Sequence, residues 1–313
     1  MQDSIPASIM TEANNTLTHE ESIRGLIWRR FRRHPGAIMG CIVLGCIILA
    51  IAFAGLSPYD PEKSDIAARY QPPSVAHPMG TDALGRDSMT RVLFGGRISL
   101  TVGLSVMMIT LIIGVPVGAI AGYFGGNVDN VLMRITDAAL SLPSLLVLIL
   151  LSAILREVDA PFLKSNPVLT IASVIGLLAW MFTARLVRAS YLAIREMDYV
   201  TATRALGATN LRIIARHIFP NAIGPVIVES TLEVAYAILE ESGLSYLGFG
   251  IQPPTPSWGN LLSNAQEYLV KYPWLAIFPG IMIFLSVISI NYIGDGLRDA
   301  FDPYKVLQKM GEV

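Results

Sequence analysis

Cysteine and histidine are scarce in this chain. Its 313 residues include two cysteines and four histidines. Cys41 and Cys46 lie five positions apart in one apolar stretch, where a small apolar filler is a more common role than a redox or metal pair. The histidines are scattered, and no H-E-x-x-H motif occurs. The sequence therefore predicts no metal site and no metalloenzyme.

Charge is scarce as well. Asp, Glu, Lys and Arg make up 15% of the residues and hydrophobic residues 53%, with a formal net charge of −1. No basic stripe or platform of aromatic side chains is present, so we expect no nucleic acid as a partner. The P-loop pattern G-x-x-x-x-G-K-[ST] is also absent, so the chain is not expected to bind ATP in the usual way.

Long apolar runs, in contrast, are abundant. A helix that crosses a hydrocarbon layer of ~30 Å needs roughly 20 mostly apolar residues. Five charge-free stretches approach or exceed that length: Ala37–Leu56, Ile98–Gly122, Ala138–Leu155, Pro167–Ala184 and Trp274–Gly294. A sixth, Asn221–Leu239, is interrupted by Glu229 and Glu233. We therefore expect an all-α membrane protein with six transmembrane helices. The polar segment 1–21 has no signal-peptide pattern, so the first span is expected to stay in the mature protein.

The placement of Lys and Arg predicts the orientation. With six spans and the N-terminus inside, the inside segments hold 15 basic residues and the outside segments 8. This bias favours a cytoplasmic position for both ends. The chain then divides into a cytoplasmic tail (1–36), the first span (37–56), an outside segment (57–97), a core of five spans (98–297) and a cytoplasmic tail (298–313).

The outside segment 57–97 has two parts. Residues 57–78 are rich in proline and polar residues and are expected to form a loop. Thr81–Gly96 alternates apolar and charged positions in a way that predicts a short amphipathic helix lying at the membrane surface.

The longest inside loop, 185–220, is expected to have a function of its own, because loops that only connect are usually short. Asp198 is a good N-cap residue for a helix over Tyr199–Leu206, and Gly207 suits a left-handed C-cap. A second helical stretch is predicted over Asn210–Phe219.

The first of these two helices exposes small side chains, Ala202 and Ala205. Small side chains let a helix sit deep in a groove of a partner protein. The same helix would also suit lipid headgroups, with nearby arginines on the phosphates. Periodicity alone leaves both readings open. The second helix is expected to stop at Pro220.

The centre of this loop resembles the cytoplasmic motif of binding-protein-dependent ABC importer permeases, which is Glu-Ala-Ala, three residues, Gly, nine residues, Ile, one residue, Leu-Pro. Thr201-Ala202-Thr203 stands at the Glu-Ala-Ala positions, and Gly207 and Pro220 stand at the glycine and proline. His217 and Phe219 replace the Ile and Leu. The alanine, glycine and proline match, whereas the glutamate is missing.

Further segments resemble the dipeptide, oligopeptide and nickel permeases of that family. They are 77–87 with 95–100, 121–126, 141–145, 247–259 and 294–303. Together they extend over about 24–304 in the same order, and the C-type subunits of peptide permeases are the most similar members.

The resemblance implies a type I ABC importer permease with a MetI-like core and a cytoplasmic coupling helix. From their positions in the motif, the resemblance implies that eight residues couple this chain to the ATPase: Asp198, Tyr199, Thr201, Ala202, Thr203, Ala205, Leu206 and Gly207. It implies a second homologous permease subunit, two cytoplasmic ATPases that hold ATP and Mg, and an extracytoplasmic peptide-binding protein, all at the bacterial plasma membrane. The expected cargo is di- or oligopeptides, with no cofactor and no catalysis in this chain.

Glu229 and Glu233 are four residues apart and share one helical face. Acidic residues in a span are costly and normally face protein or water. Our hypothesis is that both line the peptide path. Pairing with a partner subunit or with Arg185 and Arg188 stays open. An ion-coupled secondary transporter or channel would use the same two carboxylates and is the alternative function.

For three other acidic residues the sequence predicts simpler roles. Asp137 is expected to pair locally with Arg134, three residues earlier on the same helix. Glu240 and Glu241 are expected to reach the outer interface.

Overall fold

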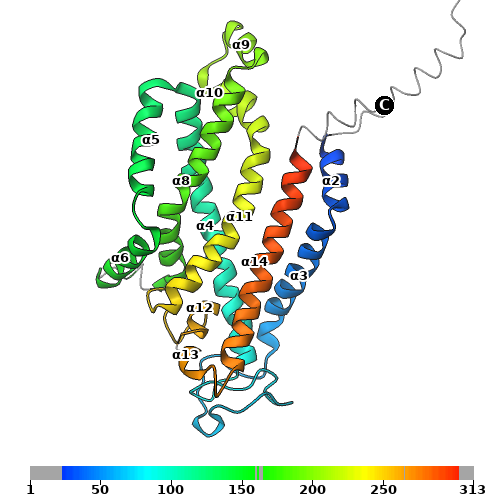
Figure 1. The fold of residues 1–313 in the computed structure, drawn as a ribbon, viewed down its shortest axis with the longest axis vertical. Coiled ribbons are helices and arrows are strands. Elements are labelled where there is room, and N and C mark those ends of the chain that lie inside the picture. The colour runs from blue at the N-terminus through cyan, green and yellow to red at the C-terminus, as the bar shows by residue number, and fades with distance from the viewer. Residues whose placement is uncertain (1–22, 159–160, 162–164, 264, 303–313) are drawn as a thin grey trace, which may run out of the picture.

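The computed structural model describes residues 23–158, 161, 165–263 and 265–302. Within these ranges the chain is helical and forms no strand, apart from one isolated bridge between Thr81 and Asp87. The long helices run roughly along one axis, with α9 at one end and α12 and α13 at the other (Figure 1). These are called the α9 end and the α12 end below.

Among the residues that the structure describes, five helical units are long and apolar enough to cross a membrane. They are α3 (Pro35–Ala52) with η1 (Phe53–Leu56), α4 (Ser88–Phe124), α8 (Pro167–Arg195), the unit Asn210–Tyr246 and α14 (Trp274–Phe301). The unit Asn210–Tyr246 contains α10 (Asn210–Arg212), the π-helical η3 (Ile213–Ile218) and α11 (Phe219–Tyr246). A sixth crossing is possible only if α5 (Gly126–Leu140) and α6 (Ser144–Glu157) act as one bent pair. The all-α membrane fold is thereby confirmed.

The remaining elements are short. They are α2 (Ile23–Arg33), η2 (Ile66–Ala68), α9 (Asp198–Ala205), α12 (Trp258–Leu261) and α13 (Ala265–Tyr268). Both α2 and the end of α14 lie at the α9 end (Figure 1), where Arg30 donates a hydrogen bond to the carbonyl of Asp302 at 3.2 Å. The first and last described residues therefore lie at the same end of the molecule.

The prediction of one continuous span over Ala138–Leu155 is wrong. Helix α5 ends at Leu140, α6 begins at Ser144, and the two are bent by 85°. Pro143 directly precedes α6, and a proline disfavours helical geometry in the residue before it. The apolar run continues through the break, so hydropathy alone could not reveal it.

The prediction of a separate amphipathic helix over Thr81–Gly96 is also wrong. Helix α4 begins at Ser88 and continues without a break to Phe124, so its first turns and the second apolar run form one helix. At about 1.5 Å per residue these 37 residues extend over about 55 Å, well beyond a ~30 Å hydrocarbon layer.

The turn before α4 explains the late start of that helix. The Asp82 carboxylate accepts the backbone N–H groups of Leu84 at 2.8 Å and Arg86 at 3.0 Å, which fixes a turn instead of a helix. Gly85 has a positive φ of 75°, which most side chains avoid. Asp87 then caps α4 by accepting the N–H of Thr90 at 2.7 Å.

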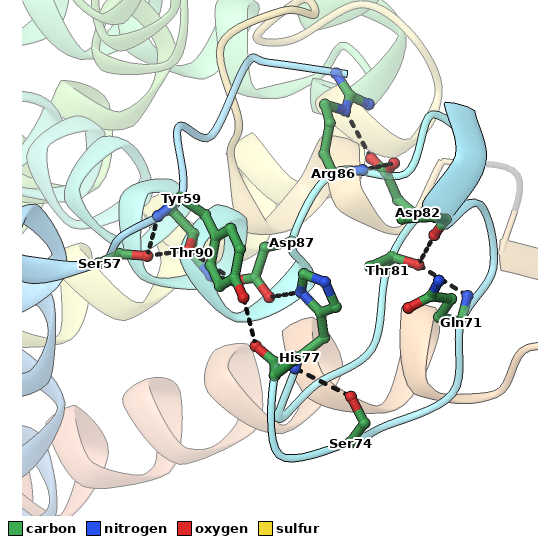
Figure 2. A network of polar contacts seen from close by, with 12 residues as sticks. Ser57, Tyr59, Gln71, Ser74, His77, Thr81, Asp82, Arg86, Asp87 and Thr90 are labelled. Carbon is green, nitrogen blue, oxygen red and sulfur yellow. Dashed lines mark hydrogen bonds and ion pairs between the residues drawn. The ribbon is translucent and has the colours of Figure 1, made fainter. Parts of the chain in front are cut away.

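The loop 57–87 is held together by a polar network around Asp87 (Figure 2). His77 Nδ1 lies 2.9 Å from Asp87 Oδ1, and the Thr90 hydroxyl donates to Asp87 Oδ2 at 2.6 Å. Ser57 Oγ lies 2.5 Å from Thr90 Oγ1, and Tyr59 donates its hydroxyl to a loop carbonyl. These contacts join the end of η1 and the loop to the first turn of α4.

The prediction that the second helical stretch stops at Pro220 is wrong. The π-helical segment Ile213–Ile218 leads directly into α11, and Pro220 lies in the first turn of that helix. A π turn shifts the hydrogen-bond register by one residue, which suits a proline that has no N–H to donate. The result is a single helical unit that continues from the α9 end to the α12 end.

Helices α4 and α8 make the most extensive contact in the bundle. Gly114, Gly118 and Gly122 lie four residues apart on α4 and face α8. A Cβ at Gly114 would lie 2.7 Å from the carbonyl oxygen of Trp180, and one at Gly122 would lie 2.6 Å from Tyr191 Cβ. Small residues therefore set the close approach of the two backbones, as they commonly do in membrane helices.

At the α12 end a buried carboxylate joins three segments. Glu241 is fully buried, and its two oxygens accept hydrogen bonds from Ser99 at 3.0 Å and Ser245 at 2.6 Å. Ser99 also accepts the backbone N–H of Trp258, at 3.2 Å. Glu241 was expected at the outer interface, and that expectation is wrong because serines on α4 and α11 satisfy the carboxylate inside the protein.

Candidate functional site

The first candidate site is the segment that joins α8 to the next span. Helix α9 covers Asp198–Ala205, with Met197 and not Asp198 at the N-cap position. Asp198 is instead the first helical residue, where its negative charge favours the positive end of the helix dipole. Gly207 has a φ of 82°, so the expected left-handed conformation after this helix is confirmed.

Helix α9 is fixed to the bundle by one buried side chain and a small set of hydrogen bonds. Val200 is fully buried and belongs to a cluster with Ile213 and Ile218 of the π segment. Tyr199 donates its hydroxyl to the carbonyl of His217 at 3.2 Å, and Asn221 donates to the same carbonyl at 2.8 Å. The π segment thus provides both the apolar side chains against which α9 packs and the carbonyl to which Tyr199 of α9 bonds.

The rest of α9 is presented to solvent. The predicted coupling residues Asp198, Tyr199, Thr201, Ala202, Ala205, Leu206 and Gly207 are all exposed, whereas Thr203 is half-buried. Two large apolar side chains stand out, because Leu206 is 88% exposed and Leu211 is 75% exposed. An apolar, small-residue surface of this kind, on a helix with few anchors, is suited to a further docking partner.

The base of the α9 segment is tied to the end of α4. Tyr123 donates its hydroxyl to Asn210 Oδ1 at 2.8 Å. Arg195, the last residue of α8, donates to the carbonyls of Gly122 at 3.0 Å and Tyr123 at 3.3 Å, which are otherwise at the open end of α4. Arg204 of α9 lies over the Tyr123 ring at 5.9 Å. A displacement of α9 would therefore move the ends of α4 and α8.

Two ion pairs join α8 to α5. Arg188 donates to both oxygens of Asp129, at 2.5 and 2.6 Å, and Arg185 donates to Asp137. The expected local pair of Asp137 with Arg134 is therefore wrong. Pairing of Arg185 and Arg188 with the glutamates of α11 is wrong too, because both arginines are engaged by α5.

The second candidate site is a cavity of about 520 Å³ between α5, α6, α8 and α11. Glu229, Glu233, Tyr236 and Glu240 line it from one face of α11, and Arg298 reaches it from α14. The shared face predicted for Glu229 and Glu233 is confirmed. Glu240 lines the same cavity.

Sequence reasoning missed several residues of these two sites. Tyr123, Arg195 and Asn210 lie in or next to segments that the sequence singled out, but only the fold shows that Tyr123 bonds to Asn210 and that Arg195 bonds to the end of α4. Tyr236 and Glu240 could have been found, because they continue the spacing of Glu229 and Glu233 on α11 by three and four residues. Among the described residues, no group of three His, Cys, Asp or Glu is placed to hold a metal ion.

Comparison with known proteins is consistent with this geometry. Residues 114–305 match the family described as binding-protein-dependent transport system inner membrane component. Residues 22–73 match the N-terminal transmembrane domain of oligopeptide transport permease C.

Relatives match over most of the chain. A peptide transport system permease protein of Brucella abortus is 42% identical over 276 residues, covering 88% of this chain and 90% of the relative. A peptide permease protein of Brucella suis is 38% identical over 97% of this chain and 98% of the relative. The oligopeptide transport system permease protein OppC of Bacillus subtilis is 40% identical over 88% of this chain and 87% of the relative.

A solved structure supports the fold. The MetNI methionine ABC transporter, in an inward-facing conformation, matches with a TM-score of 0.56 and 19% identity, covering 68% of this chain and 97% of that chain. The type I importer permease fold expected from the motifs is therefore confirmed. Together, these findings show that the chain belongs to the family of binding-protein-dependent transport system inner membrane components, as a multi-pass permease subunit of an ABC importer and not an enzyme.

Proposed function

We propose that this chain forms half of the translocation path of an importer for di- or oligopeptides. The observation that carries this proposal is the identity of 38–42% to proteins named as peptide permeases, over 88–97% of the chain. The ion-coupled alternative has no support among these relatives.

The proposed assembly contains a second permease subunit, two cytoplasmic ATPases that bind ATP and Mg, and an extracytoplasmic peptide-binding protein. In this arrangement the α9 end faces the cytoplasm, and both ends of the chain lie there. The excess of basic residues on the segments at that side supports this orientation. ATP is hydrolysed on the partner subunits, because this sequence has no P-loop.

Coupling is proposed to take place through α9. The exposed Ala202, Ala205 and Leu206 would enter a groove of an ATPase, and Gly207 would let the chain turn back to the bundle. The links from Asn210 to Tyr123 and from Arg195 to the end of α4 would pass a displacement of α9 on to the spanning helices. ATP can shift the balance of two states only through contacts that differ between them.

The cavity lined by Glu229, Glu233 and Glu240 is proposed to be part of the peptide path. Three carboxylates and a single arginine give it a negative balance that suits an ammonium group or a basic side chain. Tyr236 adds an aromatic surface for the body of the peptide.

Uptake by the reconstituted assembly tests this proposal. Proteoliposomes that hold the two permease subunits and the ATPases, with the peptide-binding protein outside, should accumulate radiolabelled trialanine when ATP is inside. Accumulation should stop when the P-loop lysine of the ATPases is replaced. A lack of uptake of any peptide of two to five residues, together with ATP-driven uptake of a non-peptide solute, would contradict the peptide cargo.

A further inference from the structure

A second cavity, unrelated to the α9 segment, lies at the α12 end and has a volume of about 300 Å³. The turn before α4 and the first turn of α4 form one wall, and α12, α13 and the start of α14 form the others. Its polar lining residues are Asp82, Arg86, Ser88, Arg91, Asn260, Ser263 and Tyr268. Trp274 and several aliphatic side chains complete the lining.

Two of these polar side chains are more than nine-tenths buried, and each has one polar atom without a hydrogen-bond partner among the described residues. Arg91 is 3% exposed and donates from Nη1 to the carbonyl of Pro61 at 2.8 Å. Its Nε, however, has no hydrogen-bond acceptor within the described part of the chain. Ser88 is 7% exposed, and its hydroxyl is equally without a partner there. Buried polar groups of this kind are normally satisfied, and both of these side chains line the cavity.

The charges around the cavity do not balance. Asp82 is already engaged by Arg86, whose Nε donates to Asp82 Oδ2 at 2.8 Å, as Figure 2 shows. The same oxygen lies 3.5 Å from Arg91 Nε, so two guanidinium groups share one carboxylate. Glu62 also acts on Arg91, but it is exposed to solvent, which screens its charge. Apart from the exposed Glu62, the half-buried Arg86 and the buried Arg91 have one carboxylate between them, so one positive charge is left for an anion to neutralise.

The lining also indicates what kind of anion would fit. A volume of about 300 Å³ is at the lower limit of small-molecule sites, which favours a ligand the size of one amino acid. Next to the arginines lie Tyr268 and Trp274, which belong to an aromatic cluster with Tyr70 and Tyr272. The site thus combines a cationic end with an aromatic wall.

We propose that this cavity binds the carboxylate of a small organic acid. Arg91 Nε and the Ser88 hydroxyl donate to the carboxylate oxygens, because neither atom has a hydrogen-bond partner among the described residues. The apolar body of the acid lies against Tyr268 and Trp274. A monovalent carboxylate matches the single excess charge, whereas water alone would satisfy the hydroxyl of Ser88 and leave that charge in place.

Binding of 4-fluorophenylacetate tests the proposal without any need for transport. The full-length chain, assembled with its partner subunits in lipid nanodiscs, is titrated with this acid and followed by fluorine NMR line broadening. The uncharged amide, 4-fluorophenylacetamide, is the matched probe. We expect the acid to bind about tenfold more tightly than the amide, in line with a hydrogen bond to a charged group. Equal binding of acid and amide would overturn the proposal and leave the cavity to water.

Three variants locate the binding. Arg91→Gln should weaken acid binding about tenfold, and Ser88→Ala about threefold, with little effect on the amide. Lys63→Gln removes a positive charge from an exposed position of the same loop and should change neither. If Arg91→Gln fails to assemble, the affinity of the Ser88→Ala protein decides, since this change removes a hydroxyl that has no hydrogen-bond partner among the described residues. Wild-type affinity in the Ser88→Ala protein would overturn the assignment.

Discussion

Single residues in this chain take their roles from their partners more than from their type. Glu241 and Asp137 are both carboxylates in or near spanning helices. Glu241 is fully buried with serine donors, whereas Asp137 is largely exposed and pairs with Arg185. Gly207 is defined instead by its backbone, because a φ of 82° is one that side chains with a Cβ rarely adopt.

Gly207→Val should abolish peptide uptake while the ATPases still bind nucleotide. A β-branched residue in the left-handed region is strained by about 1–2 kcal/mol or more, so the chain would leave α9 in a different direction. Labelled-peptide uptake and nucleotide binding are measured on the same assembly. Gly45→Val is the control, since Gly45 has no atom near its Cβ position. Normal uptake by Gly207→Val would remove the coupling role from this turn.

The double substitution Glu229→Gln and Glu233→Gln should reduce uptake of lysine-containing peptides relative to neutral ones by about threefold to tenfold. A difference of about 1 kcal/mol, the typical net contribution of one hydrogen bond, corresponds to this range. Competition uptake with trilysine and trialanine measures the ratio. Glu267→Gln, at an exposed position of α13, is the matched control. An unchanged ratio would place the two glutamates outside the path.

At the scale of elements, the sequence predicts what depends on local composition and misses what depends on neighbours. The apolar runs of α3, α8 and α14 and the short helix before Gly207 follow from patterns within one segment. The late start of α4 depends on the turn built by Asp82, and the break at Pro143 lies inside a run that stays apolar. Tyr123 could not be assigned to the α9 segment, because its partner Asn210 lies 87 positions later.

Two ion pairs between α5 and α8 differ in how far they are exposed to solvent, so their contributions to stability can be compared. Arg188 pairs with Asp129, whose side chain is 11% exposed, whereas Arg185 pairs with Asp137, whose side chain is 60% exposed. Arg188→Gln leaves the poorly solvated carboxylate of Asp129 without its partner, so it should destabilise the protein by about 2–3 kcal/mol. This cost is smaller than the cost of about 3–5 kcal/mol expected when a fully buried ion pair is broken. Arg185→Gln should cost under about 1 kcal/mol.

Thermal unfolding of the assembly in nanodiscs, followed by exposure of buried tryptophan, compares the two variants. The Arg188→Gln protein should unfold at a clearly lower temperature than the Arg185→Gln protein. The reverse order would mean that the Asp129 pair does not hold α5 to α8.

At the scale of the whole molecule, the two ends of the helical bundle carry different structural features. The α9 end carries an exposed helix with few anchors. Close to it in the chain, Asn210 bonds to Tyr123 of α4, and Arg195 joins the end of α8 to the end of α4. The α12 end carries a folded loop and a cavity with buried arginine. Between them lies a cavity lined by carboxylates. This division suits a subunit that performs no chemistry and is driven from one side.

Solute accumulation with and without the ATPases tests that idea most directly. Liposomes that hold the two permease subunits alone, with the peptide-binding protein outside, are compared with liposomes that also hold the ATPases and internal ATP. We expect accumulation of labelled peptide above the external concentration only in the second set. Sustained accumulation by the permease subunits alone, driven by a proton or sodium gradient, would contradict the account.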